Sequence, residues 1–291
     1  MNSGLHRSLY LLGPIFIVSF HIGCLLLLVT GLSLGALLWA VGLYLVRMLA
    51  ITSVYHRLLV HRSYRAPRAV LWIGCAVAAS AGQMGPSWWK AHHLQHHRHV
   101  DTAADPHTPL MPLHGWRGLW NSQAGWLLRS SFFPDELPAD VEADPVLRRL
   151  DRLHSLPLLA LAGLSYLVGG WMYLGAFFLS TTVLFHGVAT VNSVAHVWGD
   201  QPFRTDDHSR NNALVALITL GEGWHNLHHA FPFAVRQGYT VRDGQLRLRP
   251  DPTFRFIRLL QRFGLADQLR QPSDDTLLQR ASGGTPLAVA P

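Results

Sequence analysis

The sequence predicts an all-α integral membrane protein in which four transmembrane helices carry a helical cap on the cytosolic side. Composition is the first reason: 49% of the residues are hydrophobic and only 14% are charged, against roughly 25% charged in soluble proteins. The second reason is that two stretches, 8–46 and 153–199, contain no Asp, Glu, Lys or Arg. Since one span needs about 20 apolar residues, each stretch is long enough for two spans.

Turn residues divide each apolar stretch into a pair of helices. Gly31-Leu32-Ser33 interrupts the first stretch, and Gly169-Gly170 interrupts the second. A soluble helix of this length has a charged face, which these segments lack, so a soluble helical core is disfavoured. The first segment is also too long for a signal peptide and leads directly into the second. The predicted spans cover about 9–30, 34–54, 156–174 and 176–197.

The arginines predict how these spans are oriented. The net charge of +7 is almost entirely arginine, since Lys90 is the only lysine. Every arginine lies before residue 8, between 47 and 152, or after 200, and both turns lack basic residues. The positive-inside rule then places both termini and the whole middle region in the cytoplasm. The arginine-rich, alanine-rich composition favours a bacterial protein, and hence the inner membrane.

The remaining residues are expected to form the cap, from 55–152 and 198–270, within one membrane domain covering 1–270. Residues 66–86 are apolar but short, and a fifth span there would move part of the chain to the wrong side. We therefore expect them to lie along the membrane interface or on the cap. Residues 101–152, rich in Trp, Pro and Asp, are expected to be loop and amphipathic helix.

The C-terminal part is basic and then polar. Residues 236–270 carry an apolar face, between Phe254 and Leu260, beside several arginines. We expect this face to pack on the domain or on anionic lipid headgroups. From about Gln271 the composition predicts a disordered tail, 271–291. No basic cluster is interleaved with aromatic residues, so a nucleic acid partner is not expected.

Three histidine clusters indicate the chemistry: His56-x4-His61, His93-x2-His96-His97 and His225-x2-His228-His229. Eight imidazoles are too many for one metal ion, and neutral imidazole suits Fe, Zn, Cu or Ni rather than Mg or Ca. Each cluster falls just outside an apolar segment, on the predicted cytoplasmic side. The sequence therefore predicts a site for two transition-metal ions with nitrogen ligands.

Helical spacing predicts which of these histidines face one another. Residues at i, i+3 and i+4 share one face of an α-helix, so the second and third clusters should each point one way. His56 and His61 are five residues apart, about 140° around an α-helix. We therefore expect this pair to serve different metals, or to lie where the second span ends.

Four further polar residues are candidates for the site. His196, a ninth possible ligand, shares a helix face with Asn192 near the cytoplasmic end of the fourth span. The amide of Asn192 suits holding a water near a metal ion. Glu222 and Asp105 are expected to accept hydrogen bonds from ligand imidazoles and so orient them. For Glu222, a charge at a helix N-terminus is an alternative interpretation.

In these motifs the sequence resembles the membrane-bound fatty acid desaturases, specifically the acyl-CoA (stearoyl-CoA, delta-9) group in its bacterial form. The resemblance covers about residues 10–265 and combines motifs that are highly specific together. The matching pieces are His56-Arg57-Leu58 with His61-Arg62-Ser63-Tyr64, His93 to His97 followed by Asp105-Pro106-His107, Asn192-Ser193-Val194-Ala195-His196, and Gly221-Glu222-Gly223-Trp224-His225 running through His228-His229 to Phe231-Pro232-Phe233.

The resemblance implies a four-span fold, a cytosolic cap holding a di-iron site, and O2-dependent formation of a cis double bond, delta-9, in a long-chain acyl group. Asn192 would approach one iron through water, and Gln83 and Trp89 match positions beside the acyl tunnel. A separate electron donor is expected, such as ferredoxin or cytochrome b5 with its reductase. The implied iron ligands are His56, His61, His93, His96, His97, His196, His225, His228 and His229.

The sequence departs from the animal acyl-CoA enzymes beside the second cluster. The positions of an Arg-Asp pair that contacts the CoA headgroup in those enzymes are Ala91 and His92 here, and Met84 replaces an Asn. The segment Gly85 to Trp89 is more similar to bacterial members. The acyl carrier thus stays open between CoA, acyl carrier protein and membrane lipid.

The alternative functions are of two kinds: another reaction of the same oxidant, and a function that involves no oxidation. An unactivated CH2–CH2 unit has no acidic proton, so its hydrogens must be removed by an oxidant. The same oxidant permits hydroxylation, or acetylenic or terminal desaturation, of a chain bound to a carrier protein. A metal transporter is disfavoured because transporters place ligands near the bilayer midplane. A metal-assisted hydrolase would need an open site with a carboxylate base, and only Glu222 is close in sequence.

Overall fold

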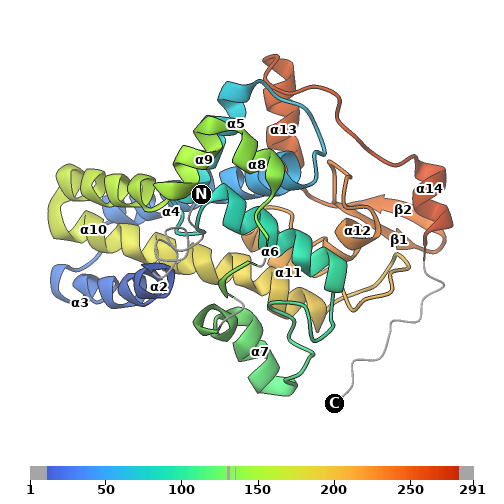
Figure 1. Ribbon diagram of the computed structural model, residues 1–291, viewed down its shortest axis with the longest axis horizontal. Helices are drawn as coiled ribbons and strands as arrows, with labels where there is room; N and C mark the ends of the chain where they lie inside the picture. Colours follow the sequence, from blue (N-terminus) through green and yellow to red (C-terminus); the bar gives the residue numbers. More distant parts are fainter. Residues whose placement is uncertain (1–11, 130–131, 135, 282–291) are drawn as a thin grey trace. The chain divides into compact units, whose positions relative to one another are not determined.

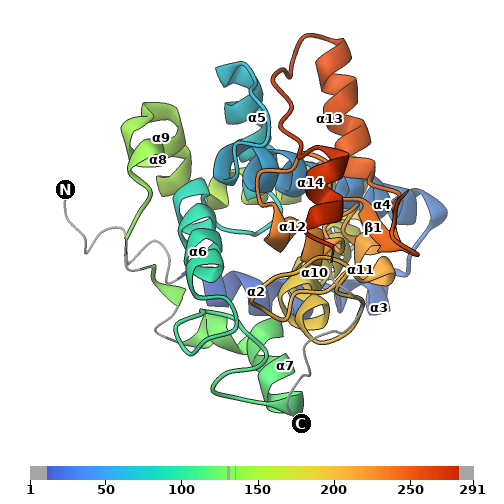
Figure 2. The ribbon, with the colours of Figure 1, turned by 90° about the vertical axis from the view of Figure 1, so that its right-hand side faces the viewer.

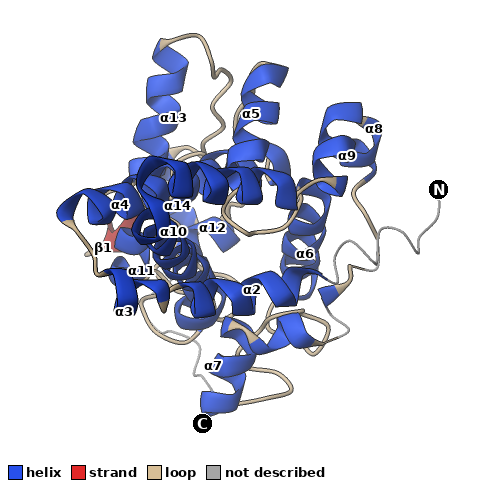
Figure 3. Cartoon of the chain, turned by 90° about the vertical axis from the view of Figure 1, so that its left-hand side faces the viewer, coloured by secondary structure: helices blue, strands red, loops and turns tan. Residues whose placement is uncertain are grey.

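The computed structural model describes residues 12–129, 132–134 and 136–281. Apart from loops and turns, the described chain consists of helices, one short β-hairpin and isolated bridges (Figure 3), so the predicted helical class is confirmed. It divides into two compact units that alternate along the sequence. The first unit comprises Met1–Tyr55, Trp72–Ala91 and Phe133–His186, and the second comprises His56–Leu71, His92–Phe132 and Gly187–Pro291.

The first unit contains the apolar helices. Gly31 has a φ of 72° and turns the chain after α3, and the Ser33 hydroxyl then accepts from the Ala36 N–H at 3.2 Å to begin α4. The turn predicted at 31–33 is therefore present. Residues 9–11 of the first predicted span lie outside the described residues. The helices are α2 (Leu12–Gly23), α3 (Leu26–Thr30), α4 (Leu34–Ala50), α8 (Ala139–Ala143) and α9 (Pro145–Arg152), with parts of α5 (Arg68–Ala79), α6 (Pro86–His99) and α10 (Ser155–Ser193).

The long helix α10 is two helices joined by a glycine turn. Gly169 and Gly170 have non-helical dihedral angles, and Gly170 lies at φ 64° and ψ −150°, a region open almost only to glycine. Figure 1 shows the chain reversing direction within α10. This is the turn that the sequence predicted between the third and fourth apolar segments.

The first unit has small residues where its helices pack together and large apolar side chains on its surface. Ala36, Ala40 and Ala176 form one buried cluster, so helices approach closely there. By contrast, Leu28, Val29 and Leu167 are more than four-fifths exposed. Large apolar side chains left this exposed are typical of a surface that meets lipid or another protein.

Two helices of the described chain are long and apolar enough to cross a membrane, Leu34–Val60 and Ser155–His196. Ile17–Thr30 and Arg68–Ala79 are apolar but shorter. The helix Arg68–Ala79 is α5, and it lies inside the predicted interfacial segment 66–86. Membrane association is supported by these helices, while the count of four spans and the position of α5 stay predictions.

The second unit holds the histidine clusters. Its core includes Phe203, Leu227 and Leu277, and Figure 2 shows α14 close to α12 and β1. Ile257 of α13 is buried with Tyr64 and Val235, so the apolar face predicted in 236–270 packs on the domain at this point. Its elements are η1 (Ile51–Val60) in part, the rest of α5, α6 and α10, α7 (Gly115–Gln123), η2 (Gly125–Leu128), η4 (Val194–His196), α11 (Ala213–Ile218), α12 (His225–Ala230), β1 (Tyr239–Arg242), β2 (Gln245–Leu248), α13 (Pro252–Arg262) and α14 (Asp274–Gln279).

The β-hairpin in the basic segment was not predicted. Strands β1 and β2 pair antiparallel, with Arg242 opposite Gln245. Asp243 and Gly244, the two residues between them, have φ values of 53° and 69°. An Asp-Gly pair with both φ positive is the preferred two-residue hairpin turn, so the signal was present in the sequence.

The predicted disordered tail is wrong for residues 271–281. Ser273 caps α14 by accepting from the Thr276 N–H at 3.2 Å, and Leu277 is fully buried in the cluster with Phe203. Two leucines in a polar sequence give little compositional signal, because the burial of Leu277 depends on a partner 74 residues earlier. Residues 282–291 lie outside the described part.

Backbone strain at the glycine turn in α10 can be tested with a matched pair of substitutions. A Cβ on Gly170 would meet no atom within 4 Å, so Gly170→Ala introduces backbone strain without a clash. We expect it to destabilise the protein by about 1–3 kcal/mol, measured as a lower thermal unfolding midpoint of the purified chain in detergent. The control Gly163→Ala, also in open space but inside the helix, should be stabilising by about 0.5–1 kcal/mol. Equal midpoints for the two variants would show that the turn is unstrained.

Candidate metal centre

The first histidine cluster lies in a π-helix. The segment Ile51–Val60 is π-helical, and the His61 N–H donates to the His56 carbonyl at 3.1 Å, an i to i+5 bond. This wider turn brings residues five apart nearly above one another, and the two imidazole rings lie 4.8 Å apart between centroids. The expectation that His56 and His61 serve different metals assumed α-helical geometry and does not fit this arrangement.

The second and third clusters follow their predicted helical spacing. His93, His96 and His97 lie in α6, and His93 Nε2 is 3.0 Å from His97 Nε2. The third cluster lies in the short helix α12, where His225 Nε2 is 3.0 Å from His229 Nε2. In both helices the i, i+4 pair points its ring nitrogens to one side.

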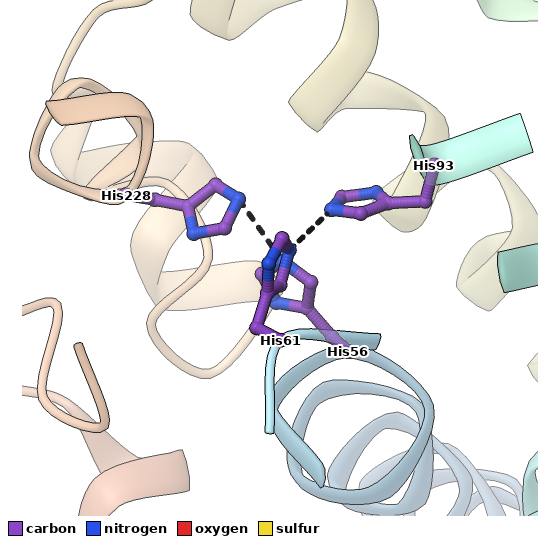
Figure 4. Close-up of side chains that lie close together, drawn as sticks. All are labelled: His56, His61, His93 and His228. Carbon is purple, nitrogen blue, oxygen red and sulfur yellow. Dashed lines mark hydrogen bonds between the residues drawn. The ribbon is translucent and has the colours of Figure 1, made fainter. Parts of the chain in front are cut away.

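The clusters combine into two groups of four imidazoles. His56, His61, His93 and His228 form one group, drawn in Figure 4, where the four rings point toward one another. The other group consists of His96, His196, His225 and His229. Within each group, the candidate ligand nitrogens all lie within 4.8 Å of one another.

His97 stands between the two groups. Its Nε2 lies 3.0 Å from His93 Nε2 and 2.9 Å from His228 Nε2. It also forms a third candidate group with His228 and His229. The structure thus brings together all nine histidines that the sequence selected, eight from the clusters and His196 from the end of α10.

Four carboxylates hold the Nδ1 atoms of four of these imidazoles. Asp105 lies 2.8 Å from His96 Nδ1, and Glu222 pairs with His56 Nδ1. The sequence singled out both acids for this position. It did not select Asp101, 3.1 Å from His196 Nδ1, or Asp207, 2.9 Å from His229 Nδ1.

The carboxylates determine where the imidazole lone pairs point. A neutral imidazole has one N–H and one lone pair, so an Nδ1–H donated to a carboxylate leaves Nε2 as the lone-pair nitrogen. His96 and His229 both donate Nδ1–H in this way, yet their Nε2 atoms face each other at 3.4 Å. Neither Nε2 then has a proton to donate. Converging lone pairs of this kind repel unless a cation lies between them, so the residues fit a metal ion.

Burial favours the neutral form of five of these imidazoles. Burial first, and neighbouring imidazoles second, hold the pKa of His93, His225 and His228 well below the ordinary value of 6.5. The same causes lower the pKa of His97 and His229. Neutral imidazole is the form that binds a metal, because a protonated ring has no free lone pair.

The carboxylates stay ionised despite their burial. Burial by itself would raise the pKa of Asp105, Asp207 and Glu222. Charge attraction and hydrogen bonds from histidines outweigh burial and lower the pKa of Asp105 and, together with Arg57, that of Glu222. For Asp207, hydrogen bonds from Ser209 and the charge of His196 lower the pKa. These contacts therefore keep the carboxylates ionised, and an ionised carboxylate accepts the hydrogen bonds that the imidazole Nδ1–H groups donate.

A buried arginine fixes the acid behind the first cluster. The Arg57 side chain is fully buried and donates to Glu222 at 2.9 Å and to Asp251 at 3.1 Å. Asp251 also accepts from the Gln237 backbone N–H at 2.8 Å, and Gln237 Nε2 lies 3.2 Å from His228 Nδ1. Because both Arg57 and His56 engage Glu222, this carboxylate is poorly placed as the free base of a metal-assisted hydrolase.

Three other predicted site residues, Asn192, Gln83 and Trp89, lie outside the imidazole groups. Asn192 lies in α10, one turn before His196, and is half-buried. Gln83 and Trp89 belong to the first unit, where the Trp89 ring packs on Tyr55 with centroids 5.6 Å apart. A role for Asn192 toward a metal-bound water, and for the other two beside an acyl tunnel, stays a prediction.

Comparison with known proteins identifies related sequences. The fatty acid desaturase family profile matches residues 11–247. An acyl-CoA C20 delta5-desaturase of Anemone leveillei is 35% identical over 229 residues, 77% of this chain and 70% of the relative. A palmitoyl-monogalactosyldiacylglycerol delta-7 desaturase of Arabidopsis thaliana is 35% identical over 243 residues, 81% of this chain but only 62% of the relative. An sn-1 stearoyl-lipid 9-desaturase of Anabaena variabilis is 34% identical over 263 residues, 88% of this chain and 92% of the relative.

The carboxylate contacts generate a test with a neighbouring control. Asp207→Asn removes the acceptor charge from His229 Nδ1, and Asp206→Asn alters an exposed acid next to it. We expect Asp207→Asn to weaken transition-metal binding by roughly 10–100-fold, since an orienting acid is worth that much. Metal content after dialysis against a graded chelator measures this, and Asp206→Asn should match the parent. Loss of metal in both variants, or in neither, would contradict the role assigned to Asp207.

The histidine pKa values predict a loss of stability in acid. Folding lowers the pKa of His93, His225 and His228 below 6.5, so these groups contribute stability that is fully present above that pH. As the pH falls below about 6.5, the unfolded chain takes up protons that the folded chain refuses, and the stability is lost. We expect the unfolding midpoint and the bound metal to decline together from about pH 7 to pH 5. A midpoint that holds constant over this range would contradict buried neutral imidazoles.

Proposed function

The chain belongs to the fatty acid desaturase family, and on this basis we propose that it is an O2-dependent fatty acyl desaturase. It introduces a cis double bond, at the delta-9 position, into a long-chain acyl group carried as a thioester or lipid. The observation that carries the proposal is the pair of four-imidazole groups with His97 between them. Two transition-metal ions held by these groups would supply the redox chemistry that an unactivated CH2–CH2 unit requires.

The residues fit two iron ions held by nine histidines. His97 lies against His93 and His228, so it would join the group of His56, His61, His93 and His228 in holding one iron. His96, His196, His225 and His229 would hold the other iron, with Asn192 near it through a water. When bound, the iron pair would supply the oxidant: with O2, two electrons and two protons, a CH2–CH2 unit loses two hydrogens and gives a double bond and two waters.

The protein's own residues supply position and charge rather than acid–base catalysis. Asp101, Asp105, Asp207 and Glu222 hold the imidazole Nδ1–H groups, so that the Nε2 lone pairs stay directed inward. Their low pKa values keep protons off these acids at neutral pH. Fixing the acyl chain is the remaining task, because the site of desaturation depends on which carbon meets the irons.

We infer four membrane spans, with both termini and the metal centre in the cytoplasm and an acyl tunnel beside Gln83 and Trp89. The arginine distribution and the glycine turn in α10 support this topology. The acyl carrier is CoA, acyl carrier protein or a membrane lipid, since the relatives include enzymes named for acyl-CoA and for lipid substrates. A separate donor, such as ferredoxin or cytochrome b5 with its reductase, delivers the electrons.

Expression in a host that lacks delta-9 unsaturation tests the proposed reaction. With iron and a competent reductase supplied, we expect mass spectrometry of the lipids to show new cis-monounsaturated chains. His97→Ala should abolish them, because His97 contacts both imidazole groups. The control His99→Ala alters an exposed imidazole two residues further along α6, outside the described metal groups, and should leave the product unchanged. Hydroxylated or acetylenic products would replace the proposed outcome, and unaltered lipids would refute it.

A further inference from the structure

A pocket lined by arginines lies in the second unit, behind the first histidine cluster. Its volume is about 580 Å³, and Arg62, Arg65 and Arg270 line it together with Gln268, Leu58 and Tyr64. All three arginines are exposed to solvent. None of the described lining residues is acidic, and Asp267, which pairs with Arg65 through backbone bonds, has an exposed side chain outside the lining. We call this site the arginine pocket.

Two chain segments build the arginine pocket rigidly. Arg65 N–H donates to the Asp267 carbonyl at 2.9 Å, Asp267 N–H donates back at 2.8 Å, and Arg270 N–H donates to the Ser63 carbonyl at 2.8 Å. These bonds use only the backbone of Arg65, so its side chain is not needed to hold the segments together. The Arg270 guanidinium stacks 4.9 Å from the Phe233 ring, which fixes its position.

Two lining residues have unusual backbone conformations. Arg62 and Gln268 both lie in the left-handed region, with φ values of 49° and 46°. Non-glycine residues are uncommon there, and such conformations concentrate where a chain presents groups to a ligand. Strain on both walls of one pocket therefore favours a binding role.

The surroundings of the arginine pocket are apolar. The loop after α13 exposes Phe263 by 72% and Leu265 by 39%, and it leads directly into the wall at Gln268. Large apolar side chains beside arginines are typical of a surface that enters the headgroup region of a membrane. Guanidinium groups match phosphate oxygens with paired hydrogen bonds. Leu58 and Tyr64 supply an apolar wall for the glycerol and upper acyl carbons.

We propose that the arginine pocket binds the phosphate of an anionic phospholipid headgroup, with Phe263 and Leu265 in the membrane surface. This rests on the membrane association proposed above but not on the desaturation reaction. Leu58 lies between His56 and His61, and Arg62 follows His61, so the bound lipid also braces the π-helical turn of the first cluster.

Native mass spectrometry of the delipidated full chain in detergent tests the arginine pocket. Dihexanoyl phosphatidylglycerol is the probe, inorganic phosphate is the second arm, and Arg65→Gln is the variant. We expect one tight phosphatidylglycerol site that Arg65→Gln weakens roughly tenfold, since it removes a charged hydrogen-bond donor. The control Arg258→Gln changes an exposed side chain of α13 that lies outside the pocket lining. It should weaken binding less than about twofold.

Four outcomes would overturn the proposal. Equal weakening by Arg65→Gln and Arg258→Gln would mean general attraction to a basic surface. Phosphate binding as tight as lipid binding would mean a site for free phosphate. Lipid binding that neither variant changes would exclude the pocket. If Arg65→Gln weakened only binding of an acidic electron-transfer protein, the pocket would be a docking site for that protein. Metal content serves as the folding control, because it is read without any desaturation assay.

Discussion

Hydrogen bonds from imidazole Nδ1–H groups to buried carboxylates are the interactions on which this site depends. Asp101, Asp105, Asp207 and Glu222 each hold one imidazole, and each bond leaves an Nε2 lone pair aimed at other Nε2 atoms. Without a cation, the Nε2 lone pairs of His96 and His229, 3.4 Å apart, repel each other, because the Nδ1–H of each ring is donated to a carboxylate. The second unit therefore holds these lone pairs in place, and a bound metal ion would relieve the repulsion. The carboxylates would also offset part of the charge of such ions.

The backbone supplies the other half of the geometry. A π-helical turn places His56 and His61 on one side, although an α-helix would separate them. The buried Arg57 in the same turn ties Glu222 to Asp251, which connects the first cluster to α12 and to the start of α13. The first cluster is thus fixed by one unusual turn and one buried ion-pair network. Such turns are rare outside functional sites, because they weaken the helix that contains them.

Sequence patterns identified the candidate ligands but not all of the residues that hold them in place. The i, i+3, i+4 spacing was enough for α6 and α12, and the Gly31 and Gly169-Gly170 turns followed from glycine and from the breaks in apolar sequence. The π-helix was missed because helical periodicity assumes 3.6 residues per turn. Asp207 was missed because it lies in a loop 22 residues before His229, where spacing carries no information. A usable signal was the scarcity of acids: the chain has only 17, so those beside histidines merit attention.

The proposed di-iron site requires that nine histidines of this chain hold two iron ions. Quantitative iron analysis of the anaerobically purified protein, combined with X-ray absorption at the iron edge, tests it most directly. We expect two irons per chain, with nitrogen neighbours and the outer-shell scattering of imidazole rings around both. One iron per chain, or a first shell made mainly of oxygen from carboxylates, would contradict it.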